Sequence, residues 1–338
     1  MKVLIIGGTG LISTAISRQL LAKDVSLTLF NRGQSAIRFP EGAVKIINGD
    51  RNQHSAFEAQ MQQGESFDCV IDMICYTPEQ AHSAVRAFQG RTQQFIFCST
   101  VDVYSKPAHR YPIREDEPRM SASSYGQNKI QCEDVFMEAH MREDFAVTLI
   151  RPAMTYGEGG GIVDTWGWST RIFDRLLKGK PILVHGDGTA LWCACHVDDV
   201  APAFVNAISA NAYGKAYHVT GEEWMPWNHY YQAAAAAVDA PSPTFVHVPS
   251  HVIAHLAPER SIPLVTNFQG VSIYDNSAAR TDLGFSYTIS WIDGVRRTYQ
   301  WLLDHHRIEN SDEDPLDDQI IQAWEAAEAD LVRAFQSR

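Results

Sequence analysis

Short apolar runs alternate with helical patterns from residue 2 to residue 152. Each run is rich in Val, Ile, Leu and Phe, as expected for strands that are buried on both faces. The runs are KVLIIGG (2–8), VSLTLF (25–30), VKIING (44–49), FDCVIDMI (67–74), QFIFCST (94–100) and AVTLIRP (146–152). Segments with i, i+3, i+4 apolar spacing lie between them, such as LISTAISRQLLA (11–22) and PEQAHSAVRAF (78–88). This alternation predicts a doubly wound parallel sheet with helices on both faces.

The alternation ends near residue 153, and this change sets the expected domain boundaries. TYGEGGG (155–161) is a loop, and the later part of the chain mixes helices with more prolines. HVDDVAPAFVNAI (196–208) predicts a helix with Asp198 or Asp199 near its start, and KAYHVTG (215–221) predicts one more strand. We therefore predict a main domain over 1–153 and about 196–221, and a small C-terminal lobe over 154–195 and 222–338.

The composition is that of a globular protein and excludes several functional classes. Apolar residues make up 45% of the 338 residues, and the formal net charge is −12. Apart from one doublet in VRR (295–297), Lys and Arg are scattered singly, which argues against a nucleic-acid partner. No apolar run approaches the roughly 20 residues of a membrane span, and the six cysteines show no disulfide spacing. We expect a cytoplasmic protein with no membrane partner, and no metal at CACH (193–196).

The stretch GGTGLIS (7–13) joins the first predicted strand to the first predicted helix. Gly7 allows a tight turn, Gly10 lets a diphosphate approach the helix N-terminus, and Ser13 is small enough for close packing of helix on strand. This context predicts a dinucleotide-binding domain of the Rossmann type, with an α/β fold. The expected contacts are Gly7, Thr9, Gly10, Leu11 and Ile12.

The end of the second strand indicates which dinucleotide is bound. LFNRGQ supplies Asn31 and Arg32 there, with no acidic residue to accept from the ribose hydroxyls. Arginine can instead bind a 2′-phosphate, so we expect NADP rather than NAD, unless Arg32 is only a solvated surface charge. In GDR (49–51), Asp50 is placed to accept from the adenine amino group, although a turn-capping Asp would look the same. Arg51 and Pro152 complete the expected cofactor contacts.

Tyr125 and Lys129 in YGQNK are four residues apart at the start of a predicted helix, so they share one helix face. A neighbouring ammonium lowers the pKa of a phenol, and such a tyrosine can exchange a proton with a secondary alcohol. The lysine can also hold the nicotinamide ribose. Ser99 and Thr100 follow the fifth strand, at the sheet edge where ligands of parallel sheets bind.

Several motifs together resemble the extended short-chain dehydrogenases/reductases of the NAD-dependent epimerase/dehydratase family. They are GGTGLIS, GDR, CSTVDVY, PIREDEP, YGQNKIQCE, RPAMTYG, GDG and HVDDVA, and they span residues 3 to about 220. The family places its catalytic hydroxyl four residues before the Tyr of the VY pair, which is Tyr104 here. The resemblance therefore implies Thr100, Tyr125 and Lys129 as the catalytic residues, with Ser99 as the alternative hydroxyl.

The chain departs from the family pattern at two places that concern the substrate. Val101 and Asp102 stand where dehydratases of the family carry an Asp-Glu pair, and Trp192 and Cys193 stand where nucleotide-sugar members carry Arg-Asp. Two buried phosphates need charged partners, so we expect a free sugar or polyol-like ring with an aromatic side chain against its carbons. The expected contacts are Ser99, Asp102, His109, Tyr156 and Trp192, with Trp166 and Trp168 as further aromatic candidates.

The resemblance implies an NAD(P)-dependent epimerase or oxidoreductase that acts on a secondary alcohol or ketone of a sugar-like substrate. The sequence leaves epimerase and reductase open. Two alternatives stand beside this reading: an RNA-binding protein like the plastid members of the group, which resemble the chain in LFNRG, and a non-catalytic NADP sensor. One apolar face of the helix predicted over 315–335 packs on its own chain or forms a homodimer contact.

Overall fold

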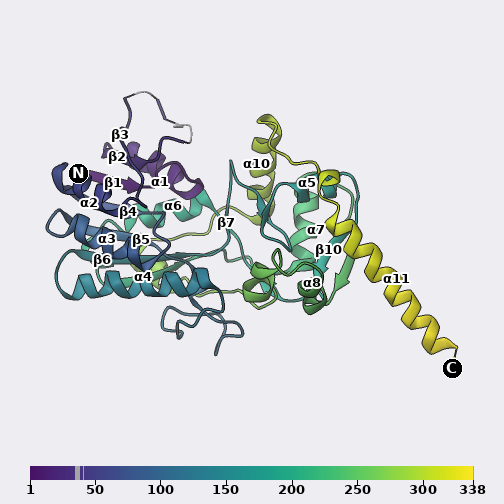
Figure 1. The fold of residues 1–338 in the computed structure, drawn as a ribbon. Helices are drawn as coiled ribbons and strands as arrows, with labels where there is room; N and C mark the ends of the chain where they lie inside the picture. The colour runs from purple at the N-terminus through teal and green to yellow at the C-terminus, as the bar shows by residue number, and fades with distance from the viewer. Residues whose placement is uncertain (35–38, 41, 338) are drawn as a thin grey trace. The chain divides into compact units, whose positions relative to one another are not determined.

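The computed structural model describes residues 1–34, 39–40 and 42–337, which form two compact units (Figure 1). The first unit comprises Met1–Thr155, Cys195–Gly221 and Tyr274–Thr288, and the second comprises Tyr156–Ala194, Glu222–Ile273 and Ile289–Arg338. The prediction from the sequence places residues 274–288 in the C-terminal lobe. They belong to the first unit because helix α9 (Ser277–Leu283) packs against its last strand and against helix α6 (Val197–Asn206).

The first unit is built on a parallel sheet that has seven strands among the described residues, in the order β13-β6-β5-β4-β1-β2-β3. The strands are β1 (Lys2–Ile6), β2 (Ser26–Asn31), β3 (Lys45–Asn48), β4 (Phe67–Asp72), β5 (Thr92–Cys98), β6 (Ala146–Pro152) and β13 (Lys215–Val219). Each of the apolar runs forms a strand, so the predicted Rossmann-type sheet is confirmed.

Helices cover both faces of this sheet. One layer contains α1 (Leu11–Leu21), α6 and α9, and the other contains α2 (His54–Gln63), α3 (Pro78–Phe88) and α4 (Ser124–Met141). Strand β1 shows why its sequence is continuously apolar. Val3 and Ile5 belong to the core under the first helical layer, whereas Leu4 and Ile6 belong to the core under the second. Alternate residues of one strand therefore serve two cores.

The second unit is a smaller assembly of helices and short strands around an aromatic core. Trp192, Trp227 and Phe268 contact one another there, and Trp291 stacks on Tyr230 with 4.2 Å between ring centroids. Its elements are β8 (Ile162–Val163), β9 (Trp168–Ser169), α5 (Arg171–Leu177), β10 (Ile182–His185), β11 (Leu191–Trp192), β14 (Met225–Pro226), α7 (Trp227–Ala237), β15 (Phe245–Val248), α8 (Ser250–Leu256), α10 (Trp291–Asp304) and α11 (Leu316–Gln336). Strands β8–β9 and β11–β14 pair antiparallel, and β10–β15 pair parallel.

The last helix, α11, is buried only near its start. Ile320 and Ile321 are buried, whereas Leu331 and Phe335 on the later turns are exposed. The apolar face that the sequence predicts is therefore only partly covered by this chain, and the homodimer stays a prediction. None of the helices that the described residues form is both long enough and apolar enough to cross a membrane.

Candidate active site

The glycine turn between β1 and α1 forms a cradle that side chains would fill. Gly7 has a φ of +84°, and a Cβ atom there would lie 2.5 Å from Cγ2 of Ile74. Gly10 is the N-cap of α1 and has no side chain that could accept from the first backbone N–H groups of the helix. The first turn of the helix contains no acidic residue. The first backbone N–H groups of α1 are therefore available to an anion, as the diphosphate of a dinucleotide requires.

A cavity of about 460 Å³ opens beside this turn, within the first unit. Seven of the predicted cofactor residues line it, whereas Leu11, Ile12, Lys129 and Pro152 are not among its lining. The lining consists of Gly7, Thr9, Gly10, Phe30, Asn31, Arg32, Gly33, Gln34, Gly49, Asp50, Arg51, Asn52, Ile74, Tyr76 and Gln80. The cavity thus joins the glycine turn to the carboxyl end of β2.

Asn31 and Arg32 stand at the end of β2, as the sequence predicts. Asn31 is buried, and its Nδ2 atom has no hydrogen-bond partner among the described residues. Arg32 is exposed on the wall of the cavity and makes no ion pair with another described residue. A buried donor without an acceptor and a solvent-facing guanidinium fit the adenosine end of a dinucleotide.

Arg51 lines the cavity, and its contact with a cofactor stays a prediction. Its buried guanidinium forms an ion pair with Asp72 and donates to the carbonyl of Gln80 at 2.9 Å. These bonds hold Arg51 in the floor of the cavity, because a buried charge needs its counter-charge. Asp50 accepts from the backbone N–H of Asn52 at 2.9 Å, which is the turn-capping role that the sequence left open.

Thr100, Tyr125 and Lys129 come together where β5 ends and α4 begins. The Thr100 side chain is a neighbour of the Tyr125 hydroxyl, and Thr100 Oγ1 accepts from the backbone N–H of Asp102 at 3.1 Å. Lys129 lies one turn along α4, only 1% exposed, and its Nζ donates to the carbonyl of Cys98 at 2.8 Å. The i, i+4 spacing thus places the lysine beside the tyrosine, with Nζ 5.8 Å from the Tyr125 ring centroid.

The pKa of Tyr125 is raised from its ordinary value, contrary to the prediction that Lys129 lowers it. Loss of solvent around the hydroxyl is the main cause, although 40% of the residue's surface is exposed, and the carboxylate of Asp102 adds to it, whereas the neighbouring Thr100 side chain opposes it. The ammonium of Lys129 bonds to a carbonyl and faces aromatic rings rather than the phenolic oxygen. Tyr125 is therefore a neutral phenol at neutral pH.

Sequence reasoning missed Tyr76, which connects the cavity to the tyrosine–lysine pair. Its side chain lines the cavity, and its ring centroid lies 5.0 Å from Lys129 Nζ and 6.4 Å from the Tyr125 ring centroid. Phe97 flanks the same ammonium at 4.7 Å. Three rings thus surround one cation, an arrangement in which each ring face attracts the charge. No motif pointed to Tyr76, because it follows a strand as an isolated aromatic residue.

A second missed group is the buried network around Glu133 of α4. Its carboxylate accepts from Ser99 Oγ at 2.6 Å, from Arg151 at 2.8 and 2.7 Å, and from Arg119 at 2.9 Å. The network ties α4 to the ends of β5 and β6. Glu133 and Arg151 are both within the motifs YGQNKIQCE and RPAMTYG, so the signal was present without an assigned role.

The predicted substrate residues are dispersed by the fold. Ser99 points to Glu133 and is buried, so its hydroxyl supports the fold rather than a ligand. His109 is an exposed side chain bonded to Glu117, and Asp102 is half-buried in the short helix η1 (Val101–Val103). The remaining two are in the aromatic core of the second unit: Tyr156 packs on Trp291, and Trp192 packs on Trp227. Burial thus removes Tyr156 and Trp192 from the candidate ligand contacts.

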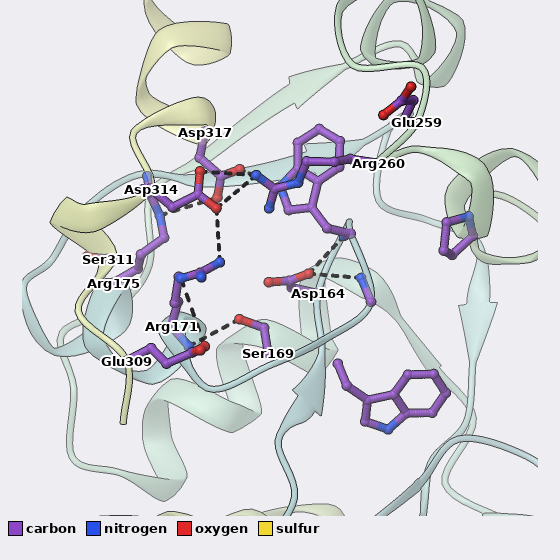
Figure 2. A pocket seen from close by; sticks show the side chains of 14 residues that line it. Asp164, Ser169, Arg171, Arg175, Glu259, Arg260, Glu309, Ser311, Asp314 and Asp317 are labelled. Atoms are coloured by element: carbon purple, nitrogen blue, oxygen red, sulfur yellow. Dashed lines mark hydrogen bonds and ion pairs between the residues drawn. The ribbon is translucent and has the colours of Figure 1, made fainter. Parts of the chain in front are cut away.

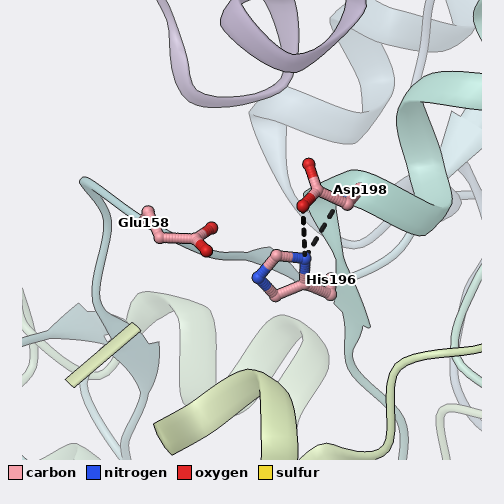
Figure 3. A group of neighbouring side chains, drawn as sticks. All are labelled: Glu158, His196 and Asp198. Atoms are coloured by element: carbon pink, nitrogen blue, oxygen red, sulfur yellow. Dashed lines mark hydrogen bonds and ion pairs between the residues drawn. The ribbon is translucent and has the colours of Figure 1, made fainter. Parts of the chain in front are cut away.

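The predicted helix over 196–208 begins with an unexpected cap. His196, rather than Asp198 or Asp199, is the N-cap of α6, and its Nδ1 accepts from the backbone N–H of Asp198 at 3.2 Å (Figure 3). An accepting Nδ1 requires the tautomer with its proton on Nε2. Cys193 and Cys195 of the CACH stretch are buried thiols.

Residues 3–220 match the NAD dependent epimerase/dehydratase family. The chain belongs to this family. Its relatives include a 2′-dehydrokanamycin reductase and a UDP-glucose 4-epimerase, so the resemblance drawn from the motifs is confirmed and the chain is an enzyme of this family. The match covers the glycine turn, the Thr100–Tyr125–Lys129 group and β13, which is most of the first unit.

Two relatives of the chain are named for different activities, one for stem-loop binding and one for reduction. The chloroplast stem-loop binding protein of 41 kDa b from Arabidopsis thaliana is 29% identical over 260 residues, covering 73% of this chain and 65% of the relative. The 2′-dehydrokanamycin reductase of Streptomyces kanamyceticus is 26% identical over 246 residues, covering 71% of this chain and 68% of that protein. The chain thus spans about two thirds of each relative.

Solved structures share the fold at low sequence identity. Pal from Bacillus thuringiensis superposes with a TM-score of 0.75 at 21% identity, over 90% of this chain and 100% of that chain. UDP-glucose 4-epimerase from Bifidobacterium longum, solved in complex with NAD+ and UDP, has a TM-score of 0.72 at 18% identity, over 91% of this chain and 100% of that chain. The fold of this family member therefore extends beyond residues 3–220 into the second unit.

Proposed function

We propose that this family member reduces a ketone on a sugar-like ring to a secondary alcohol, with NADP as its cofactor and Tyr125 as the proton donor. The observation that carries the proposal is the grouping of Thr100, at the carboxyl end of β5, with Tyr125 and Lys129, which share one face of α4. A proton donor, an orienting hydroxyl and a fixed cation are the groups that carbonyl reduction needs.

The protonation state of Tyr125 favours reduction over oxidation. Since its pKa is raised, the phenol carries its proton across the neutral range and can donate it to a carbonyl oxygen as negative charge develops there. The Thr100 hydroxyl is placed to orient the same oxygen. Lys129 Nζ, held by the carbonyl of Cys98, provides a fixed positive charge 5.8 Å from the centroid of the phenol ring. A bound nicotinamide supplies the hydride.

The fit of the cavity supports NADP as the cofactor. The N-terminus of α1 and the bare Gly7–Gly10 turn would hold the diphosphate, with Asn31 at the adenosine end. Arg32, exposed and without an ion-pair partner among the described residues, would bind the 2′-phosphate. An acidic residue at that point would favour NAD instead, and the chain has none there.

The substrate is proposed to be a sugar-like ketone without a nucleotide diphosphate. Trp192 and Cys193 occupy the positions where nucleotide-sugar members carry Arg-Asp, and each is 1% exposed. Neither can neutralise a diphosphate. The 26% identical relative is named 2′-dehydrokanamycin reductase, which supports a keto group on a sugar-type ring as the reacting function.

The proposal is tested by following NADPH oxidation with a panel of keto sugars, using wild-type protein and Tyr125→Phe. We expect turnover by the wild type, loss of turnover in Tyr125→Phe, and unchanged NADPH affinity in both by calorimetry. Unchanged turnover in Tyr125→Phe would refute the mechanism. Tightly retained dinucleotide in the purified protein, with epimerisation and no net NADPH consumption, would favour the epimerase alternative.

RNA binding is a second candidate function, because one relative is a chloroplast stem-loop binding protein at 29% identity. The formal charge of −12 opposes it, since phosphate backbones are attracted by basic surfaces. Filter retention of a labelled RNA stem-loop at physiological salt decides the question. We expect no retention, and retention that weakens steeply with added salt would favour RNA binding.

A further inference from the structure

A second cavity, of about 380 Å³, lies entirely within the second unit (Figure 2). The β8–β9 hairpin, the start of α5, the segment around Arg260 and the chain leading into α11 form its walls. Its lining consists of Asp164, Trp166, Gly167, Trp168, Ser169, Arg171, Arg175, Glu259, Arg260, Pro263, Glu309, Ser311, Asp314 and Asp317. Small-molecule sites in proteins have volumes of about 300–1,000 Å³, so a single sugar-sized ring fits.

The arginines of this cavity are already bonded to carboxylates. Arg171 and Arg260 both bond to Asp314, at 2.9 Å and at 3.0 and 2.8 Å, and Figure 2 shows the three side chains converging. Arg175 bonds to Asp318 at 2.7 Å. Five acidic residues but only three arginines line the cavity, so its charge is negative overall. The cavity therefore suits a cation better than an anion.

Two lining carboxylates, the part-buried Asp164 and the exposed Glu259, make no ion pair with a described residue, and Asp164 is the one held inside the cavity wall. One of its oxygens accepts from the backbone N–H groups of Trp166 and Gly167 at 2.8 and 3.1 Å, and no cationic side chain in the described ranges is bonded to it. Figure 2 shows its carboxyl group facing the interior of the cavity. Burial, together with the nearby charge of Asp317, raises the pKa of Asp164 to about 7. A bound cation would relieve this unfavourable charge.

The same cavity offers aromatic faces beside the carboxylates. The Trp166 indole donates to Asp317 at 2.6 Å, and the Arg260 guanidinium lies 5.1 Å from its ring centroid. Trp168 exposes 57% of its surface. Indole faces pack against the apolar C–H faces of sugar rings and attract nearby cations.

We propose that this cavity binds an ammonium group carried on a sugar-like ring, with the ammonium at Asp164 and the ring against the Trp168 indole. The site goes beyond the proposed reduction, because it uses none of the residues assigned to hydride or proton transfer. Its ligand class is an amino sugar, recognised by the uncompensated Asp164 carboxylate and an aromatic face.

The test compares 6-amino-6-deoxyglucose with glucose, which differ only in an amine replacing a hydroxyl, by titration calorimetry on the full chain at pH 8. We expect the amino sugar to bind about tenfold tighter or more, because a hydrogen bond to a charged group is worth roughly 1.5–3 kcal/mol. Its affinity should fall between pH 8 and pH 6, where Asp164 takes up its proton while an alkyl ammonium stays charged. Equal affinity for the two sugars would overturn the proposal without any variant.

Two variants locate the site. Asp164→Asn keeps the oxygen that accepts from the hairpin backbone but removes the charge, so it should abolish the preference for the amine. Trp168→Ala should weaken both sugars. Glu328→Gln, which removes the same charge from an exposed position on α11, is the matched control and should bind like the wild type. An amine preference that survives in Asp164→Asn would place the ligand elsewhere and contradict the proposal.

Discussion

Arg151 of β6 and Glu133 of α4 form a two-bond ion pair in the interior of the first unit. The Nε–Oε1 distance is 2.8 Å and the Nη2–Oε2 distance is 2.7 Å, and both side chains are almost fully buried. Because α4 also carries Tyr125 and Lys129, this pair fixes the helix that bears the proposed proton donor relative to the sheet. We regard Glu133 as a positioning residue, because it makes no hydrogen bond or ion pair with Thr100, Tyr125 or Lys129 and acts on them only by holding α4 in place.

Replacing Glu133 by Gln should lower the free energy of unfolding by about 3–5 kcal/mol, because it leaves the buried Arg151 without its counter-charge. Urea denaturation of the two proteins measures the difference. Glu138→Gln, an exposed position on the same helix, is the control and should change stability by less than about 0.5 kcal/mol. A loss no larger than that of the control would contradict the network described here.

The Glu133 carboxylate also predicts how the free energy of unfolding depends on pH in the acidic range. Burial alone would raise the pKa of Glu133, but the charge and hydrogen bonds of Arg151 outweigh it, so its pKa in the folded state is lowered. The resulting stabilisation is fully present above the unfolded pKa of about 4.3 and is lost as the pH falls through the folded value. Denaturation midpoints measured from pH 7 to pH 3 should drop more steeply in the wild type than in Glu133→Gln. Parallel curves would show that Glu133 does not titrate as its contacts indicate.

Replacing Arg32 by Ala should weaken NADPH binding by about 10- to 100-fold, since charge-assisted bonds to a phosphate are worth roughly 1.5–3 kcal/mol. NADH binding should remain the same, because NADH lacks the 2′-phosphate. Calorimetric titration of both dinucleotides checks this, with Arg18→Ala, an exposed arginine on α1, as the control. Equal losses of affinity for NADPH and NADH would mean that Arg32 does not contact the 2′-phosphate.

The ring of Tyr76, rather than its hydroxyl, should matter for the dinucleotide. Its face lies 5.0 Å from the Lys129 ammonium, and its hydroxyl makes no hydrogen bond with another described residue. Tyr76→Ala should therefore weaken NADPH binding by about 2- to 30-fold, the range of cation–π energies, whereas Tyr76→Phe should bind like the wild type. A similar loss in both variants would show that the hydroxyl contacts the cofactor.

How much the sequence predicts depends on whether a local pattern determines the position of a side chain. Continuous apolar runs identified the strands, because alternate residues of a strand such as β1 pack into cores on opposite faces of the sheet. The Tyr125–Lys129 spacing likewise located two side chains on one helix face. The sequence could not show that Arg51 turns inward, because its partner Asp72 is 21 residues away. Nor could it separate Trp192, a core residue, from an exposed indole such as Trp168, since burial depends on the whole fold.

The two adjacent hydroxyls Ser99 and Thr100 should have separable roles. Thr100 neighbours the Tyr125 hydroxyl, whereas Ser99 donates to Glu133 at 2.6 Å and is buried. Thr100→Val should therefore lower kcat by about 10²- to 10³-fold, the usual effect of removing one donor at a developing oxyanion. Because Thr100 also caps the short helix η1, the same variant should lose about 1 kcal/mol of stability. Ser99→Ala should instead lower the unfolding free energy by about 1–3 kcal/mol and leave kcat within a few fold. Thr100→Ser restores the hydroxyl and should recover activity. If Ser99→Ala carried the larger loss of kcat, the hydroxyl assignment would have to be exchanged between the two residues.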